Sequence, residues 1–525
     1  MGCKARDGSK GLFRARRIKV ERFQFNMIIA HDLGTTGNKA SLHDDSGKII
    51  RHCTVDYPVH FASGGVAEQN PQDWWQAVGA ATKKLLSESG TNPKDISGLG
   101  ISGQMMGAVL LDENFDPTRT AVIWADHRST KQTQQLIEKL GMESAYQEIG
   151  HQLNPTYSLT KAMWVRENQK EIFNKTKYIC NAKDFVNAKL TGKLVTDFSD
   201  ASSTNAFDQI KGSWSERILQ AAELNPALFP EVVPSTQILG ELTNDAASHL
   251  GLLSGIPVIV GGGDGPMAAT GAGIIHEMDG AYACMGSSSW ISLSADKPLH
   301  DPKMRTMTFN HVVEGKFVPT ATMQAGGASL HWVADLLLPN SGHDRFNVLL
   351  AEAESLPGAF DGLYFLPHIL GERSPYWNPK AAGVFAGIER HHSRGNLVKA
   401  VLEGVAFNLK TCIQAFSENN RGISSVDVIG GGAESALWMQ IFSDVWGIPV
   451  RQRSIVEEAN CLGAAVTTLV GLGKAKFEDS SNLSSIKREF LPSRESHERY
   501  LEAHEIFLDS YRFQEDWFAT RMGRT

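Results

Sequence analysis

Short, mostly apolar runs that end in glycine recur along the chain. Residues 256–260 lead into three glycines and then Asp264, and residues 426–429 lead into a second group of three glycines. Runs of this length, bounded by turn residues, are typical of buried strands. The small, Ala-rich residues 266–273 predict a tightly packed helix directly after the first strand. The pattern therefore predicts an α/β protein in which ligands bind at strand ends beside helix N-termini.

Asp264 is a single carboxylate in a strand-to-helix turn without bulky neighbours. A carboxylate there is placed to accept the proton of a bound hydroxyl, which makes Asp264 a candidate general base. An aspartate in this position also fits the N-cap of a helix in a tight turn. The local pattern leaves both interpretations open.

A tight hairpin is predicted near the start of the chain. Residues 28–30 and 39–42 read as its strands, and the sequence DLGTTG lies between them. Backbone N–H groups and the hydroxyls of Thr35 and Thr36 can point at one spot there and hold phosphate oxygens. Asp32, at the end of the first strand, is a candidate ligand for Mg²⁺. A plain hairpin with turn glycines is the alternative.

A similar device recurs in residues 281–294, where a short strand runs into MGSSS and a return strand. Two such hairpins predict a duplicated architecture with a nucleotide between the halves. The glycines after residues 426–429 and the small-residue helix that begins near residue 460 would allow a nucleotide to approach closely. The candidate residues of these turns are Gly286, Ser287, Ser288, Gly431, Gly432, Ser435 and Asn460.

Several strand ends of the first half are expected to face one cleft. Met105, Met106 and Trp124 would form an apolar wall there, and Gln104 and Asp126 would hydrogen-bond hydroxyl groups of a substrate. Core filling is the alternative role for the two methionines.

Two further segments are read as loops. Residues 196–204 form a hydroxyl-rich stretch that either approaches a sugar or is a solvated connection. Residues 364–379, in which Pro, Gly and aromatics alternate without a period, predict an ordered loop near a cleft. At the C-terminal end, residues 495–518 predict a charged, aromatic-striped helix with a packing role, or a role in a homodimer.

The composition is that of an ordinary globular protein. The chain has 525 residues, 42% hydrophobic and 21% charged, so two or more domains are expected. A net charge of −7 and the lack of any apolar run long enough to span a bilayer argue against nucleic acid or a membrane as partners. The six cysteines lie far apart without a CxxC pair, which fits reduced thiols in the cytoplasm. For His391-His392 a solvated loop is expected, because no cysteine or carboxylate lies at ligand spacing.

Residues 1–26 differ from the rest of the chain. They hold eight Lys or Arg against two acidic residues, and they lack the apolar region of a secretory signal. An Arg-rich start can imitate a transit peptide, but Met27 begins a predicted strand directly. We expect a disordered basic extension, or a stretch that precedes the true start of the protein.

The second half carries the longest match to a known signature. Residues 383–388 read GVFAGI, and they are followed by NL at 396–397 and AVLE at 400–403. This text is similar to the second signature of the FGGY family of carbohydrate kinases, within the actin-like ATPase superfamily. The resemblance spans about residues 27–472, and parts of the first signature match at Lys161, Trp164, Glu167 and Asn168, while Thr156 and Ala162 depart from it.

The resemblance implies an α/β fold of two RNase H-like (actin-like ATPase) domains flanking a central cleft that holds ATP and a sugar. Residues 27–275 would form the sugar-side domain, and residues 276–525 the nucleotide-side domain. Asp264 matches the family's catalytic aspartate, and Asp32 matches the aspartate associated with the metal. The implied cofactors are ATP and Mg²⁺, with the nucleotide held by the candidate residues of the three glycine-rich turns and by Asn460.

Within the family, the closest likeness is to xylulokinases, through AEQNPQDWW at 67–75, GISGQM at 100–105 and TDFSDAS at 196–202. Met106 stands where that subgroup often has His, and Gly265 where it often has Asn. The prediction is phosphorylation of a primary hydroxyl of D-xylulose to give D-xylulose 5-phosphate. Another ketose such as ribulose, a polyol such as erythritol, or a sugar acid such as gluconate is the alternative. A non-catalytic sugar or nucleotide sensor on the same fold is the alternative from another class.

Overall fold

Two mixed sheets form the frame of the molecule. The computed structural model describes residues 26–339, 342, 344–455 and 458–521, so the predicted extension 1–26 lies, but for its last residue, outside the described residues. The first sheet contains β1 (Met27–Leu33), β2 (Gly37–His43), β3 (Ile49–Asp56), β6 (Ile96–Gly103), β14 (Ile238–Glu241) and β15 (Pro257–Gly263). The second contains β16 (Ala281–Met285), β17 (Ser289–Leu293), β18 (Met307–Asn310), β19 (Phe317–Met323), β22 (Val426–Ile429), β23 (Val450–Arg453) and β24 (Ile486–Phe490).

The two sheets repeat one strand arrangement. In the first, the hairpin β1–β2 is antiparallel, β3 extends it on one side, and β6 and β15 run parallel to β1 on the other. In the second, β16–β17 is the hairpin, β19 extends it, and β22 and β23 run parallel to β16. An antiparallel strand, β14 or β24, ends each parallel side. This repetition confirms the duplicated architecture that the paired hairpins predicted.

Helices surround the sheets, and capping residues define where several of them begin and end. α1 begins where Asn70 accepts the N–H of Gln72 and Pro71 takes the first helical position, and it ends at Gly90 with φ 69°. α13 begins at a capping box of Ser393 and Asn396. The covering helices are α1 (Pro71–Ser89), α6 (Ala182–Thr191), α9 (Asn244–Leu250), α11 (Gly327–Leu337), α12 (Asp344–Glu354), α13 (Arg394–Glu418), α14 (Ala436–Trp446) and α17 (Arg494–Thr520).

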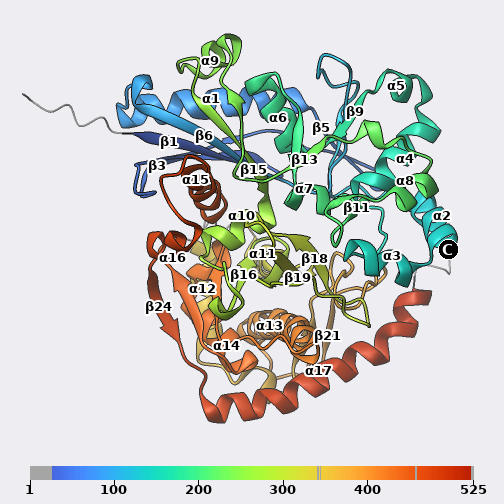
Figure 1. Cartoon of the computed structure of the whole chain (residues 1–525). Helices are drawn as coiled ribbons and strands as arrows, with labels where there is room; N and C mark the ends of the chain where they lie inside the picture. The colour runs from blue at the N-terminus through green and yellow to red at the C-terminus, as the bar shows by residue number, and fades with distance from the viewer. Residues whose placement is uncertain (1–25, 340–341, 343, 456–457, 522–525) are drawn as a thin grey trace, which may run out of the picture.

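A lobe of short helices is inserted between β6 and β14 and has its own apolar core (Figure 1). Its helices are α2 (Thr130–Leu140), α3 (Met142–Ile149), α4 (Ser158–Asn168), α5 (Lys170–Lys175) and α8 (Glu216–Ala222). Short strands accompany both halves: β4 (His60–Ala62), β5 (Val66–Gln69), β7 (Val109–Leu111), β8 (Ala121–Val122), β9 (Tyr178–Cys180), β11 (Phe207–Asp208), β12 (Ser213–Trp214), β13 (Glu231–Val233), β20 (Tyr364–Leu366) and β21 (Val384–Ala386).

The loop predicted at 196–204 is wrong. This segment forms β10 (Val195–Asp197) and the short helix α7 (Phe198–Ser202), with Asp197 as the N-cap. Its residues are buried because their hydroxyl and carboxylate groups find partners inside the protein. Hydroxyl-rich composition alone could not distinguish this arrangement from a solvated loop.

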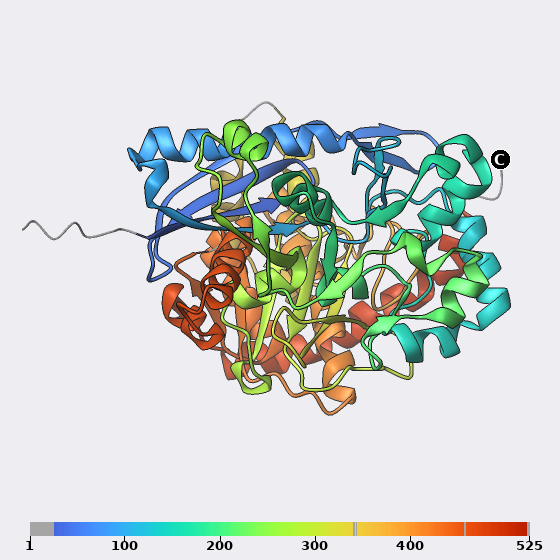
Figure 2. The same cartoon turned by 45° about the horizontal axis from the view of Figure 1, so that its top comes forward.

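Two helices join the halves through backbone contact. α10 (Asp264–Gly271) and α15 (Ala459–Gly471) lie between the two sheets in Figure 1, and the turned view of Figure 2 keeps the blue-to-green half above the yellow-to-red half. A Cβ added at Gly271 would lie 1.9 Å from the Ala459 oxygen, and one at Gly463 would lie 2.0 Å from the Met267 oxygen. Only glycine permits such an approach, so these two positions fix how closely the halves meet. Within the described part of the chain, no helix is long and apolar enough to cross a membrane.

We expect Gly463→Ala to destabilise the protein by about 2 kcal/mol or more, because its methyl group would push α15 away from the α10 backbone. Chemical denaturation would measure the change. Gly422→Ala is the matched control, since a Cβ there meets no atom within 4 Å. Equal stability of the two variants would contradict the interpretation of the helix contact.

Candidate active site

A cavity of about 190 Å³ lies between the two halves and gathers most of the predicted sugar-side residues. The first half contributes Thr35, Met105, Met106, Trp124, Asp264 and Gly265. The second half contributes Ser288, Trp290, Ser292, Met307, Phe309, Thr320, Thr322 and Arg373.

Asp264 occupies the first position of α10, directly after β15, and lines the cavity. The N-cap is Gly263, so the alternative of an N-cap aspartate is not what the structure shows. One carboxylate oxygen accepts the N–H of Gly265 at 2.8 Å. Burial, with a further contribution from Asp32, raises the pKa of Asp264 to about 7. A carboxylate with that pKa exchanges its proton readily near neutral pH.

Asp32 is held at the end of β1 by two hydrogen bonds to its Oδ1. Ser102 donates one at 2.8 Å, and Asn460 donates the other at 3.3 Å. Burial raises the pKa of Asp32, and the nearby Asp264 carries the same charge. Two neighbouring carboxylates in one site favour a cation, and oxygen donors of this kind suit Mg²⁺. Asn460, predicted on the nucleotide side, therefore acts on Asp32 in this structure.

The glycine-rich turns of the nucleotide side meet at the end of the second sheet. The β16–β17 turn supplies the carbonyl oxygens of Gly286 and Ser287, which accept the N–H groups of Gly327 and Ala328 at the start of α11 at 2.8 and 3.1 Å. The short 3-10 helix η5 (Gly431–Glu434) lies against β16, since a Cβ at Gly432 would be 2.7 Å from Met285. Two turns with accessible backbone are thus brought side by side.

The hydroxyl residues of these turns have different surroundings. Thr36 and Ser287 are exposed, whereas Ser288 lines the cavity. Thr35 also lines the cavity, and its Oγ1 accepts the indole N–H of Trp124 at 2.9 Å. Ser435 caps α14 by accepting the N–H of Trp438 at 3.2 Å.

Two expected hydrogen-bonding groups are not part of the cavity wall. The amide of Gln104 donates to the Gln69 Oε1 at 2.8 Å and turns away toward the first hairpin. Asp126 is fully buried, pairs with Arg128 and accepts the N–H of Ala67 at 2.7 Å. Both side chains therefore bind groups of the protein itself and stabilise the loops next to the cavity.

Trp290 was not predicted, although it directly follows the MGSSS hairpin. Its indole N–H donates to the Tyr282 hydroxyl at 2.9 Å, and that hydroxyl donates to the Gly265 oxygen at 2.8 Å. This chain ties the second sheet to the residue beside Asp264.

Arg373 was also missed, although its loop, residues 364–379, was expected near a cleft. Its guanidinium donates to the Thr322 hydroxyl at 3.2 Å and lies 5.8 Å from the Trp124 ring centre. Burial lowers the pKa of Arg373. Glu372 interacts with it electrostatically, but among the described residues no ion pair within 4 Å joins the guanidinium to a carboxylate, and its Nε has no hydrogen-bond acceptor. The cavity thus presents a guanidinium whose hydrogen-bonding capacity is only partly used.

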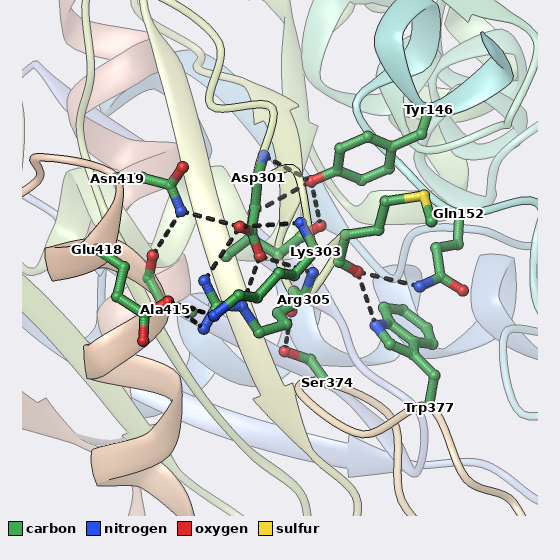
Figure 3. Close-up of polar contacts among 12 residues, drawn as sticks. Tyr146, Gln152, Asp301, Lys303, Arg305, Ser374, Trp377, Ala415, Glu418 and Asn419 are labelled. Carbon is green, nitrogen blue, oxygen red and sulfur yellow. Dashed lines mark hydrogen bonds and ion pairs between the residues drawn. The ribbon is translucent and has the colours of Figure 1, made fainter. Parts of the chain in front are cut away.

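The loop that carries Arg373 is fixed by contacts with the segment 301–306 (Figure 3). Ser374 donates to the Arg305 oxygen, and the Trp377 indole donates to the Met304 oxygen at 3.0 Å. The same segment reaches the inserted lobe, where Gln152 also donates to the Met304 oxygen at 3.0 Å. The position of Arg373 is therefore set by both halves of the molecule.

His391 and His392 lie outside helices and strands, and His391 is exposed, as expected of a solvated loop, but a carboxylate does lie near them. Asp361, distant in sequence, places Oδ2 3.0 Å from His391 Nε2 and 3.4 Å from His392 Nε2. The Nδ1 of His392 accepts the N–H of Glu389 at 2.9 Å, so in the neutral ring its Nε2 carries the proton. His391 Nε2 lies within hydrogen-bond distance of Asp361, whereas His392 Nε2 has no hydrogen-bond partner among the described residues, so the three side chains form a small cluster of polar contacts.

Comparisons with known proteins agree with this geometry. The profile of the FGGY family of carbohydrate kinases matches with its N-terminal domain at residues 27–271 and its C-terminal domain at residues 281–472. The xylulose kinase of Bacillus subtilis is 30% identical over 492 residues, 93% of this chain and 97% of the relative. The gluconokinase of the same organism is 30% identical over 501 residues, 94% of this chain and 96% of the relative.

A solved structure shows the fold. The crystal structure of xylulose kinase from Rhodospirillum rubrum superposes with a TM-score of 0.86 at 26% identity, covering 94% of this chain and all of that one. The two repeated α/β sheets are thus the actin-like ATPase fold expected from the sequence. The chain belongs to the FGGY family of carbohydrate kinases and is an ATP-dependent sugar kinase.

Proposed function

We propose that this kinase phosphorylates a primary hydroxyl of a pentulose, D-xylulose, with Asp264 as the general base. The observation that carries the proposal is a carboxylate of pKa about 7 that faces a cavity of about 190 Å³ formed by both halves. A base of that pKa is well matched to proton abstraction near neutral pH. The likeness of TDFSDAS and GISGQM to xylulokinases and the xylulose kinase relatives support the choice of sugar.

In the proposed reaction, the sugar hydroxyl gives its proton to Asp264 while its oxygen forms a bond to the γ-phosphorus of ATP. The bond between that phosphorus and the β–γ bridging oxygen breaks, and ADP leaves. Thr35, Thr36 and the turns around Gly286 and Gly431 would hold the phosphates and the nucleotide. Asp32, oriented by Ser102 and Asn460, would hold Mg²⁺, which when bound offsets negative charge on the transferring group.

A sugar acid such as gluconate is the second candidate, and Arg373 favours it. A partly unused guanidinium in a cavity is suited to a carboxylate, which it can bind through two hydrogen bonds. Gly265 adds room, because a Cβ there would meet no atom closer than 3.8 Å. The gluconokinase relative has the same identity as the xylulose kinase.

Two further proposals concern the domain boundary and the location of the protein. We keep the domain boundary between residues 275 and 276, which falls in the gap between the two matched family domains. The cysteines at 53, 180, 284, 412 and 461 are free thiols, which supports the proposed cytoplasmic location.

A substrate panel tests the choice of sugar. We expect ADP release from ATP and Mg²⁺ to respond most strongly to D-xylulose among D-xylulose, D-ribulose, erythritol and D-gluconate. A selective response to D-gluconate would move the substrate to the second candidate. In that case Arg373→Gln should lower kcat/KM for gluconate by about a hundredfold, and a smaller effect on gluconate than on D-xylulose would rule out the carboxylate contact.

Asp264→Asn should remove nearly all turnover, by a factor of about 10² to 10⁴, because an amide of the same shape cannot accept the hydroxyl proton. Sugar binding, measured by calorimetry, should remain close to that of the wild type. Asp126→Asn is the comparison for a buried aspartate outside the cavity, read together with its effect on stability. Substantial turnover by Asp264→Asn would reject the base assignment.

The activity should also depend on pH in a defined direction. Only the deprotonated carboxylate accepts a proton, so kcat/KM should rise with pH and reach half its maximum near pH 7. A divalent cation bound at Asp32 would move the midpoint lower, since it offsets the charge that helps to raise the pKa of Asp264. A rate that falls across the neutral range as pH rises would contradict this assignment.

A further inference from the structure

Three serines of one helical turn each hold a different backbone segment beside the active-site cavity. We propose that this serine turn, residues 199–203, positions the catalytic machinery: it sets where Asp264, Met106 and the second half of the cavity wall stand relative to one another. The inference rests on the proposed role of Asp264 as base. None of the residues that line the cavity comes from the turn itself, so its serines act through other residues.

The contacts of the turn reach three separate elements. Ser199 Oγ accepts the N–H of Gly263, directly before Asp264, at 2.9 Å. Ser203 Oγ accepts the N–H of Met106 at 3.3 Å, and Met106 lines the cavity.

The third contact crosses to the other half of the molecule. Ser202 Oγ accepts the N–H of Asn310 at 2.9 Å, and Asn310 follows the wall residue Phe309 in β18. One turn thus connects the base, the apolar wall of the first half and a wall strand of the second half.

The direction of each hydrogen bond is fixed by the partners of the hydroxyl protons. Ser199 donates to Asp197 at 2.5 Å, Ser202 donates to the Ser199 oxygen at 2.7 Å, and Ser203 donates to the Asp200 oxygen at 2.7 Å. A serine hydroxyl has one proton, so each oxygen can only accept on its other side. These three hydroxyls therefore receive backbone N–H groups and have no proton left for a sugar, and no residue of 196–204 lines the cavity.

The turn rests on a buried ionic cluster. Asp197 also accepts the N–H of Ser199 at 2.9 Å and the hydroxyl of Ser235 at 2.7 Å. Lys183 lies 3.3 Å from Asp197 and 2.6 Å from Asp184, and these charged side chains are fully buried. So many mutual contacts leave the turn little freedom to move.

The approach of β15 to the turn also requires a particular backbone. A Cβ at Gly262 would lie 2.9 Å from Ser199 Oγ, so glycine is needed for the strand end to come this close. Removal of a serine hydroxyl would leave a buried N–H without an acceptor, and the strand would shift to find another. Small displacements of a reacting group can lower a rate by about a hundredfold.

The test compares Ser199→Ala, Ser202→Ala and Ser203→Ala with the control Thr204→Val. Thr204 is buried next to the same turn and uses its hydroxyl in the same way, donating to the Ala201 oxygen at 2.7 Å and accepting the N–H of Ala206 at 3.1 Å. Its partners include no strand of the cavity. Thr204→Val should therefore lower the stability of the protein to a similar extent without displacing a segment that lines the cavity.

The first readout, amide hydrogen exchange, needs no sugar. We expect each alanine variant to speed exchange in the segment that its serine holds: around Gly263 for Ser199→Ala, around Met106 for Ser203→Ala and around Asn310 for Ser202→Ala. Thr204→Val should leave all three segments protected. A uniform change in all four proteins, or no change, would overturn the proposal.

The second readout is steady-state kinetics with the sugar that the wild type accepts. We expect Ser199→Ala to lower kcat by about ten- to a hundredfold with little change in KM. Ser203→Ala should mainly raise KM for the sugar, by about tenfold, because the Met106 wall moves. If the changes in kcat and KM are no larger than those of Thr204→Val, the turn only stabilises the fold and the positioning role is rejected. If the wild type phosphorylates no sugar, the proposed function fails, while hydrogen exchange still decides whether the turn holds the three segments.

Discussion

The site depends on keeping two like-charged side chains, Asp32 and Asp264, together in the interior. Burial raises the pKa of both, and Asp32 adds to the shift of Asp264. The hydrogen bonds of Ser102 and Asn460 and the nearby charge of Lys39 offset part of this repulsion at Asp32, and a bound cation would offset more of it. The carboxylate proposed as the base and the carboxylate suited to a metal therefore influence each other electrostatically.

The duplicated fold brings these groups together in one site. Asp32 ends β1, and Asp264 follows β15, so parallel strands of the first sheet deliver both to the same edge. Asn460 belongs to α15, which comes from the second half. This helix packs against strands of the first sheet, and glycines bring its backbone into contact with α10. The distance between the halves is therefore set by backbone contact, at the same place where the second half touches the metal candidate.

The sequence predicted the parts of this arrangement that depend on local pattern. Glycine-rich turns after apolar runs indicated the strand ends, and the small-residue stretches at 266–273 and near residue 460 indicated the two helices that became α10 and α15. It could not predict partners distant in the chain: Asp361 beside His391, or Gln69 for Gln104. Arg373 was missed for the same reason, since its loop has no periodicity and its place is set by residues 301–306. The sequence did not predict the burial of residues 196–204, because hydroxyl groups that hydrogen-bond the backbone look the same in sequence as hydroxyl groups that face water.

The composition of the cavity wall limits how selective the enzyme can be, and shows where selectivity must come from. Met105, Met106, Trp290, Met307 and Phe309 are apolar or mostly apolar surfaces, and such surfaces reject a wrong sugar only weakly. Buried polar groups discriminate far more strongly, because a ligand that fails to pair with them leaves them unsatisfied. Apart from Asp264, the charged group in this wall is the Arg373 guanidinium. A pentulose can offer it only hydroxyl oxygens, whereas a sugar acid offers a carboxylate, so the choice between the two substrate classes depends chiefly on how one arginine is satisfied.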